Sequence, residues 1–160
     1  MDNSNKEDFK TKLGHFRHDL RTPIGHIIGY SELIEEDMDA ETLTTSRHDL
    51  QAIQNAGQKM LALLDQYFGE AKNSIEELHI DEAQFHLRLQ LNHIVGYAEI
   101  LREDALDDGR DELIGDIDHI TEAQVKVLEL LESLGRRLFE AKGTKNRKPS
   151  KGAKSENTGN

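Results

Sequence analysis

The sequence predicts an all-α protein, an antiparallel four-helix bundle made of two helical hairpins and followed by a disordered tail. The first observation is composition: of 160 residues, 36% are hydrophobic, 32% are charged, 5% are aromatic, and two are proline. That balance suits solvated helices better than a β-sandwich or barrel. The other two observations are helical spacing of the apolar residues and an internal repeat of the helical segments.

The internal repeat has a constant offset of 67 residues. Residues 20–37 align with residues 87–104 without a gap, and nine of these 18 positions are identical. The same offset holds beyond the following turn, where it relates Asp49, Ile53 and Ala56 to Asp116, Ile120 and Ala123. One register that survives a turn indicates a duplication, because chance helical periodicity would not keep it.

The first repeat has the pattern of a helical hairpin. Its first apolar stripe has the i, i+3, i+4, i+7 spacing of a one-sided helix and comprises Ile24, Ile27, Ile28, Ser31 and Ile34. A polar break at residues 36–42 follows. A second stripe then comprises Leu50, Ile53, Gly57, Met60, Leu61 and Leu64. The break between two such stripes predicts a turn between two antiparallel helices.

The second repeat predicts a second hairpin. Its turn falls at Asp107-Asp108-Gly109, where glycine tolerates a positive φ. The stripes on either side comprise Leu91, Ile94, Val95 and Leu101, then Ile117, Ile120, Val127, Leu128 and Leu131. Between the hairpins, Asn73-Ser74 marks either a break or part of a continuous helix. We expect the Gly-Tyr pairs 29–30 and 96–97 to pack where helices approach closely.

A hairpin alone cannot bury its apolar stripe, so two hairpins in one chain favour an intramolecular bundle. The domains predicted are residues 1–74, the first hairpin; residues 75–141, the repeat hairpin that completes the bundle; and residues 142–160, a disordered basic tail. We expect a monomer with an internal pseudo-dimer. A homodimer or a domain-swapped dimer is the alternative.

Composition and charge exclude several classes of function. The chain has no cysteine, so disulfides and thiolate chemistry are absent, and it has neither a secretory signal nor an apolar run of the ~20 residues that a membrane span needs. Residues 142–160 carry six basic side chains and one acidic, so the rest of the chain accounts for about −16 against a total net charge of −11. An acidic body repels nucleic acid. We therefore expect a cytoplasmic protein that binds neither nucleic acid nor membranes, with a solubilising tail.

One short segment, residues 18–23, carries the candidate chemistry. On a helix His18 and Thr22 share a face, and Asp19 can approach the imidazole from the flank. A carboxylate that accepts a hydrogen bond from one ring nitrogen makes the other nitrogen a better nucleophile. Pro23 removes the helical partner of the Asp19 carbonyl, and Arg21 adds a nearby cation. Together these groups predict a site that handles a phosphoryl group.

The longer pattern from Phe16 to Ile34, FRHDLRTPIGHIIGYSELI, resembles the H-box of the histidine kinase dimerisation and phosphoacceptor (HisKA, DHp) domain. This resemblance implies that His18 is the phosphoacceptor and that Asp19 is the acid or base that orients it. It also implies that Thr22 positions water or a phosphoryl oxygen. In that family two chains each contribute a hairpin to a four-helix bundle; here the second repeat is expected to supply the partner hairpin.

The second repeat keeps the scaffold of the H-box but not its chemistry. At the fixed offset, His18 corresponds to Phe85, Asp19 to His86 and Thr22 to Leu89. We therefore expect a structural second hairpin and a single active site. The sequence also lacks a glycine-rich phosphate loop and the ATP-binding domain of this family, so autokinase activity is not expected from this chain alone.

These features predict a phosphorelay protein that exchanges a phosphoryl group between His18 and a response-regulator receiver domain, with a sensor histidine kinase as a further partner. We expect no cofactor or metal in this chain, and a Mg²⁺ ion on the receiver. Two alternatives stay open. The chain could be a non-enzymatic adaptor that docks a receiver or a kinase, or a phosphatase-type regulator that depends on Thr22.

Overall fold

The computed structural model describes residues 3–138 and contains four long helices. These are α1 (Asn3–Asp37), α2 (Ala40–Phe68), α3 (Ile80–Asp107) and α4 (Ile114–Glu132). Short 3₁₀ turns, Ile75–Glu77 and Asp111–Leu113, precede α3 and α4, and residues 134–138 are helical again beyond Ser133. The predicted all-α bundle of hairpins is confirmed. Residues 142–160, for which a disordered tail was predicted, lie outside the described part.

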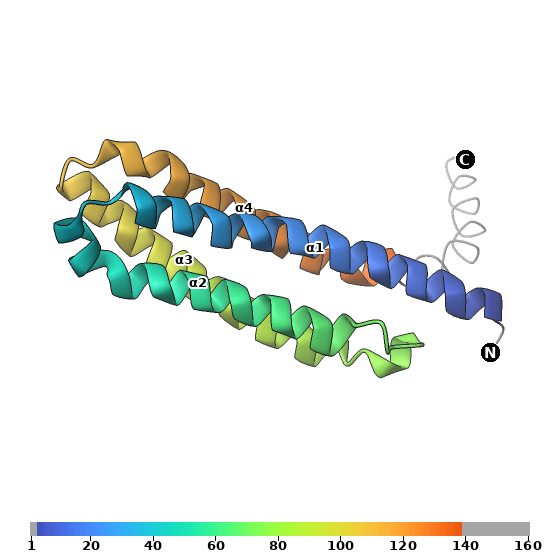
Figure 1. Cartoon of the computed structure of the whole chain (residues 1–160). Coiled ribbons are helices and arrows are strands. Elements are labelled where there is room, and N and C mark those ends of the chain that lie inside the picture. Colours follow the sequence, from blue (N-terminus) through green and yellow to red (C-terminus); the bar gives the residue numbers. More distant parts are fainter. Residues whose placement is uncertain (1–2, 139–160) are drawn as a thin grey trace, which may run out of the picture.

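The helices form a bundle in which each helix has two neighbours. Helix α1 packs against α2 and α4, and α3 packs against the same two, so α1 and α3 lie on a diagonal (Figure 1). This cyclic arrangement follows from the duplication, because the two hairpins cover each other's apolar faces. Within residues 3–138 no helix is both long and apolar enough to cross a membrane.

The predicted stripes supply the core. Nearly all of their residues are buried, and the aromatic rings of Phe16 and Phe68 meet edge to face at 5.4 Å between centroids. Burial of each large side chain contributes about 1.5–3 kcal/mol, so the combined stripes outweigh weak local preferences. Ser31, buried in the same stripe, donates a 2.7 Å hydrogen bond to the carbonyl of Ile28 and leaves no polar group unpaired there.

The two turns of the bundle lie side by side and are joined by an ion pair. Asp39 is the N-cap of α2: its Oδ1 accepts a 2.8 Å hydrogen bond from the Thr42 N–H. Its Oδ2 lies 2.6 Å from Nη2 of Arg110, in the turn after α3. The Thr42 N–H and Arg110 together lower the pKa of Asp39 to about 2. Gly109 adopts a φ of 69°, as the predicted turn requires.

The prediction for Gly29 and Gly96 is wrong. A Cβ at either position would meet no atom within 4 Å, because both glycines point away from the neighbouring helices. The close helix contact lies instead at Gly57 on α2, where a Cβ would stand 2.6 Å from Cγ1 of Ile28 on α1. The sequence shows which glycines are repeated, but close approach depends on the helix that faces them.

Candidate functional site

His18 lies on the solvent side of α1, about midway along the helix. Phe16 and Leu20 on either side of it are fully buried, so the core fixes the rotation of α1 and directs His18 outward. Thr22, one turn further on, is exposed as well. Within residues 3–138 the His18 ring takes part in no hydrogen bond or ion pair. The imidazole is therefore accessible to a partner molecule.

Asp19 is bonded to Arg137, a residue far from it in the sequence. Nη2 of Arg137 donates a 2.6 Å hydrogen bond to Oδ2 of Asp19, across 118 residues of sequence. The Arg137 guanidinium also lies 5.4 Å from the centroid of the Phe16 ring, where a cation is attracted to the aromatic face. These two contacts place Arg137 beside the H-box and fix one oxygen of the Asp19 carboxylate.

Two further arginines lie on the side of α1 that faces α2. Arg17 donates a 2.7 Å hydrogen bond to the carbonyl of Phe68, at the end of α2, and Arg21 donates one of 2.6 Å to Oδ1 of Asp65. The position of Arg21, uncertain from the sequence, is thus toward α2. His18 lies between this pair of arginines and the Asp19–Arg137 pair, so cations border it on both sides in an otherwise acidic body.

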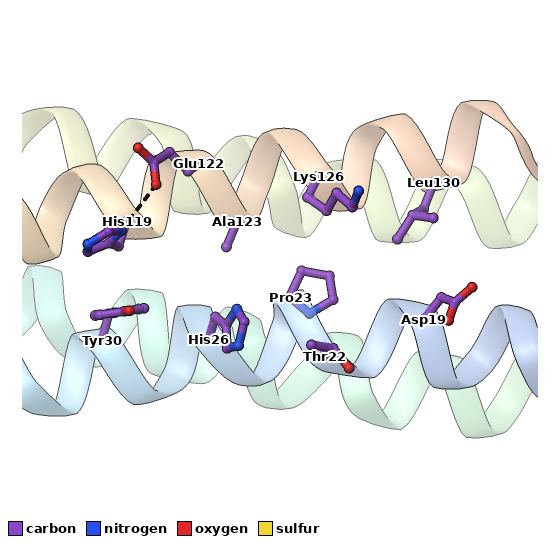
Figure 2. A pocket seen from close by; sticks show the side chains of 10 residues that line it. All are labelled: Asp19, Thr22, Pro23, His26, Tyr30, His119, Glu122, Ala123, Lys126 and Leu130. Carbon is purple, nitrogen blue, oxygen red and sulfur yellow. Dashed lines mark hydrogen bonds and ion pairs between the residues drawn. The ribbon is translucent and has the colours of Figure 1, made fainter.

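Asp19 and Thr22 line an open groove between α1 and α4, with a volume of about 650 Å³. Figure 2 shows the side chains of α1 and α4 on opposite sides of this α1–α4 groove, with Pro23 at its floor and Lys126 across from it. Helical spacing places His18 at the edge of the groove, one residue before Asp19 and one turn before Thr22. A partner that contacts His18 therefore also has access to Asp19 and Thr22.

The far end of the α1–α4 groove is aromatic. Tyr30 of α1 stacks on His119 of α4 with 4.7 Å between ring centroids, and Nδ1 of His119 lies 3.1 Å from Oε1 of Glu122 (Figure 2). His26, one turn before Tyr30, is exposed and lines the same groove. These groups lie away from His18. They line the wall of the groove and make this end of it polar and aromatic.

The second hairpin has a different set of residues at the equivalent place. Phe85 and Leu89, at the positions of His18 and Thr22, are exposed side chains of α3. His86, at the position of Asp19, is half-buried and stacks on Tyr67 of α2 with 6.2 Å between centroids. Arg137 likewise has no counterpart, since the offset relates it to Glu70. Of the charged groups around His18, only Arg21 has a like counterpart here, Arg88.

Of the three predicted site residues, Asp19 and Thr22 line one groove and His18 lies at its edge. The structure adds a fourth residue, Arg137, which bonds Asp19. Asp19 was expected beside the imidazole, but the bond that it makes is to Arg137. Sequence reasoning missed Arg137, because it lies outside the H-box and the repeat does not reproduce it. A basic residue on the last turn of a helix antiparallel to α1 was the one available signal. Within residues 3–138, no three His, Asp or Glu side chains are placed to hold a metal ion.

Fold and site together define a helical-bundle protein in which an exposed histidine, His18, lies among polar side chains. Residues 13–73, the whole H-box and the hairpin around it, match the His Kinase A (phospho-acceptor) domain family. This match confirms the resemblance predicted from the H-box and indicates two-component signalling with a phosphoacceptor histidine. No curated protein and no solved structure matches the chain.

Proposed function

We propose that His18 accepts a phosphoryl group and exchanges it with an aspartate of a response-regulator receiver domain. The observation that carries the proposal is the exposed, unbonded imidazole within the H-box, next to a carboxylate that an arginine holds. In this exchange a neutral ring nitrogen gives its electron pair to phosphorus. The bond from phosphorus to the aspartate oxygen breaks, and the carboxylate leaves with the electrons of that bond.

Asp19 would stabilise the positive charge that develops on the imidazole. One carboxylate oxygen, Oδ2, is bonded to Arg137, and we propose that the other accepts a hydrogen bond from the His18 ring once that ring changes rotamer. Arg137 would thus act as a positioning residue that limits the orientations of Asp19. We propose that the phosphoryl group comes from a sensor histidine kinase. The receiver would supply the Mg²⁺ ion at its own aspartate.

The arginines around His18 favour a bound phosphoryl group electrostatically. A phosphoryl group on nitrogen adds about two negative charges at neutral pH, which the acidic body would repel. Arg17 and Arg21 on one side and Arg137 on the other reduce that repulsion locally, although each is already paired with an oxygen acceptor.

A second activity, dephosphorylation of the receiver, is favoured by Thr22. Its side chain is exposed, it lines the α1–α4 groove, and within residues 3–138 its hydroxyl takes part in no hydrogen bond. A free hydroxyl one turn from His18 could hold a water molecule against the aspartyl phosphate of a docked receiver. This activity would not require phosphorylation of His18, so variants can separate it from phosphotransfer.

The decisive experiment is labelling with phosphoramidate, followed by incubation with candidate receivers. In this reaction the P–N bond of phosphoramidate breaks, ammonia leaves and a P–N bond to the imidazole forms. We expect acid-labile, base-stable phosphate on the wild type and on the control His15→Ala, and none on His18→Ala. Equal labelling of His18→Ala, or no labelling of the wild type by phosphoramidate or by any phosphorylated receiver, would overturn the proposal. Receiver binding without any labelling would identify an adaptor.

A further inference from the structure

The exposed large apolar side chains of the described residues gather on one helix. There are six of them, and four, Phe85, Leu89, Ile100 and Leu106, belong to α3. Phe85 is 64% exposed, an unusual setting for an aromatic side chain in a bundle with a complete core. Such a concentration on one helix marks a surface that another molecule covers.

Contacts on both sides of α3 define which face is free. Toward α4, Gln84 donates a 2.9 Å hydrogen bond to the Leu131 carbonyl, and Arg102 donates one of 3.0 Å to Asp118. Toward α2, His86 stacks on Tyr67 and the Tyr97 ring meets His48. The third side faces solvent. We call it the α3 seam, and it comprises Phe85, Leu89, Asn92, Gly96 and Ile100, spaced by four, three, four and four residues.

We propose that the α3 seam binds the α3 seam of a second copy of this chain, with the two helices antiparallel. Centred between Asn92 and His93, this pairing sets Phe85 against Ile100 of the second copy and Leu89 against Gly96. Gly96 offers the space for Leu89, since nothing lies within 4 Å of a Cβ built there. A surface that matches itself in this way is what a twofold dimer requires.

On the side toward α4, one pair of flanking charges is complementary under the same twofold axis, whereas Glu82 and Glu103, just beyond the ends of the α3 seam, come opposite each other. Arg88 lies one turn after Gln84 and Glu99 lies one turn before Arg102, so both are on the side toward α4. An antiparallel twofold pair brings like flanks together. Arg88 of each copy therefore meets Glu99 of the other, about 3 Å apart along the axis for an offset of two residues.

A second copy fits better than a strongly charged partner. The five residues of the α3 seam are uncharged, while the whole chain has a net charge of −11, so the paired seam residues add no repulsion between two copies. Because α3 is diagonal to α1, such a dimer leaves both His18 side chains exposed. Two sites on one particle would bind a paired or clustered partner more tightly than one site.

Sedimentation over a concentration series tests the dimer. We expect the average mass to rise from 18.2 kDa toward twice that value, reversibly, because a seam of four turns is smaller than a standard interface. Ile100→Glu should hold the chain at the mass of one copy. The matched control is Leu33→Glu, because Leu33 is the repeat equivalent on α1 and is 45% exposed against 44% for Ile100. A single-chain mass for the wild type up to millimolar concentration, or equal loss in both variants, would overturn the proposal.

Two further variants test the register. The chain has no cysteine, so Asn92→Cys should form a disulfide-linked dimer under oxidation, while the repeat equivalent Gly25→Cys on α1 should not. Equal cross-linking of both, or no cross-linking at residue 92, would count against the α3 seam. Arg88→Glu should weaken association and Arg88→Glu with Glu99→Arg should restore it. Failure of that restoration would exclude the antiparallel register.

Discussion

Arg137 bonds Asp19 across 118 residues of the chain. The 2.6 Å hydrogen bond joins the first hairpin, which carries His18, to the last described turn of the second hairpin. The side chain of Arg137 is 29% exposed and that of Asp19 43%, so solvent screens the pair and its contribution to stability is small. Its importance is therefore geometric. The duplicated hairpin, which was expected to be structural, contributes a residue to the neighbourhood of His18.

We expect Arg137→Gln to slow phosphoramidate labelling of His18 roughly tenfold, the lower end of the effect of removing a group that orients a reacting residue. The reason is that Asp19 would lose the contact that fixes Oδ2, and its Oδ1 would less often be in the orientation from which a rotated His18 ring can bond it. The measurement is the initial rate of labelling at several concentrations of phosphoramidate. Arg136→Gln, at the exposed neighbouring position, is the control and should label like the wild type.

A double variant shows whether Arg137 acts through Asp19. If it does, adding Arg137→Gln to an Asp19→Asn variant should slow labelling only slightly more, because the effects of two coupled substitutions are not additive. Multiplied effects of the two substitutions would show that Arg137 acts on the phosphoryl group or on folding instead. Thermal unfolding of each variant, monitored by circular dichroism, separates the last possibility from the other two.

The sequence predicts the bundle well because burial and periodicity are local properties of each helix. The stripes containing Ile24 and Leu91 and the turn at Gly109 follow directly from residue spacing. The site is harder to predict, because it depends on which residues face α1 from the other hairpin. The contact of Ile28 with Gly57 has no sequence signal, and the bond from Arg137 to Asp19 has only a weak one, because each is set by how two helices pack against each other.

Thr22→Ala should separate two activities of the site. The hydroxyl of Thr22 is expected to position water and not to receive the phosphoryl group, so labelling of His18 should stay within about twofold of the wild type. Loss of dephosphorylation of a receiver that carries aspartyl phosphate should be roughly a hundredfold, the scale of removing one positioned catalytic group. Phosphate released from the labelled receiver is the quantity to measure. Thr22→Ser, which keeps the hydroxyl, should retain dephosphorylation activity. An equal loss of that activity in Thr22→Ser and Thr22→Ala would refute a role for the hydroxyl.

Gly57→Ala should destabilise the bundle, although alanine is the better helix former. Its methyl group would stand 2.6 Å from Cγ1 of Ile28, so the Ile28 side chain or the two helices must shift, at a cost of about 1–3 kcal/mol. Gly29→Ala is the matched control on α1, because its Cβ meets nothing within 4 Å. That change should stabilise the protein by roughly 0.5–1 kcal/mol. Urea unfolding of both variants gives the two free energies, and the same sign for both would contradict the packing described.

Asp39 should make the stability of the turns depend on acid. Its pKa is lowered from 3.8 to about 2 in the folded protein by the Thr42 N–H and Arg110, so the folded state favours the ionised carboxylate. The resulting stabilisation is fully present above pH 3.8 and is lost as the pH falls toward about 2. Asp39→Asn keeps a capping oxygen but removes the charge. Its melting temperature should fall below that of the wild type at neutral pH, and the gap should close between pH 3.8 and about 2. Asp37→Asn, an exposed neighbour before the turn, should show no such gap. A gap for Asp39→Asn that stays constant down to pH 2 would mean that the charge of the Asp39 carboxylate does not stabilise this end of the bundle.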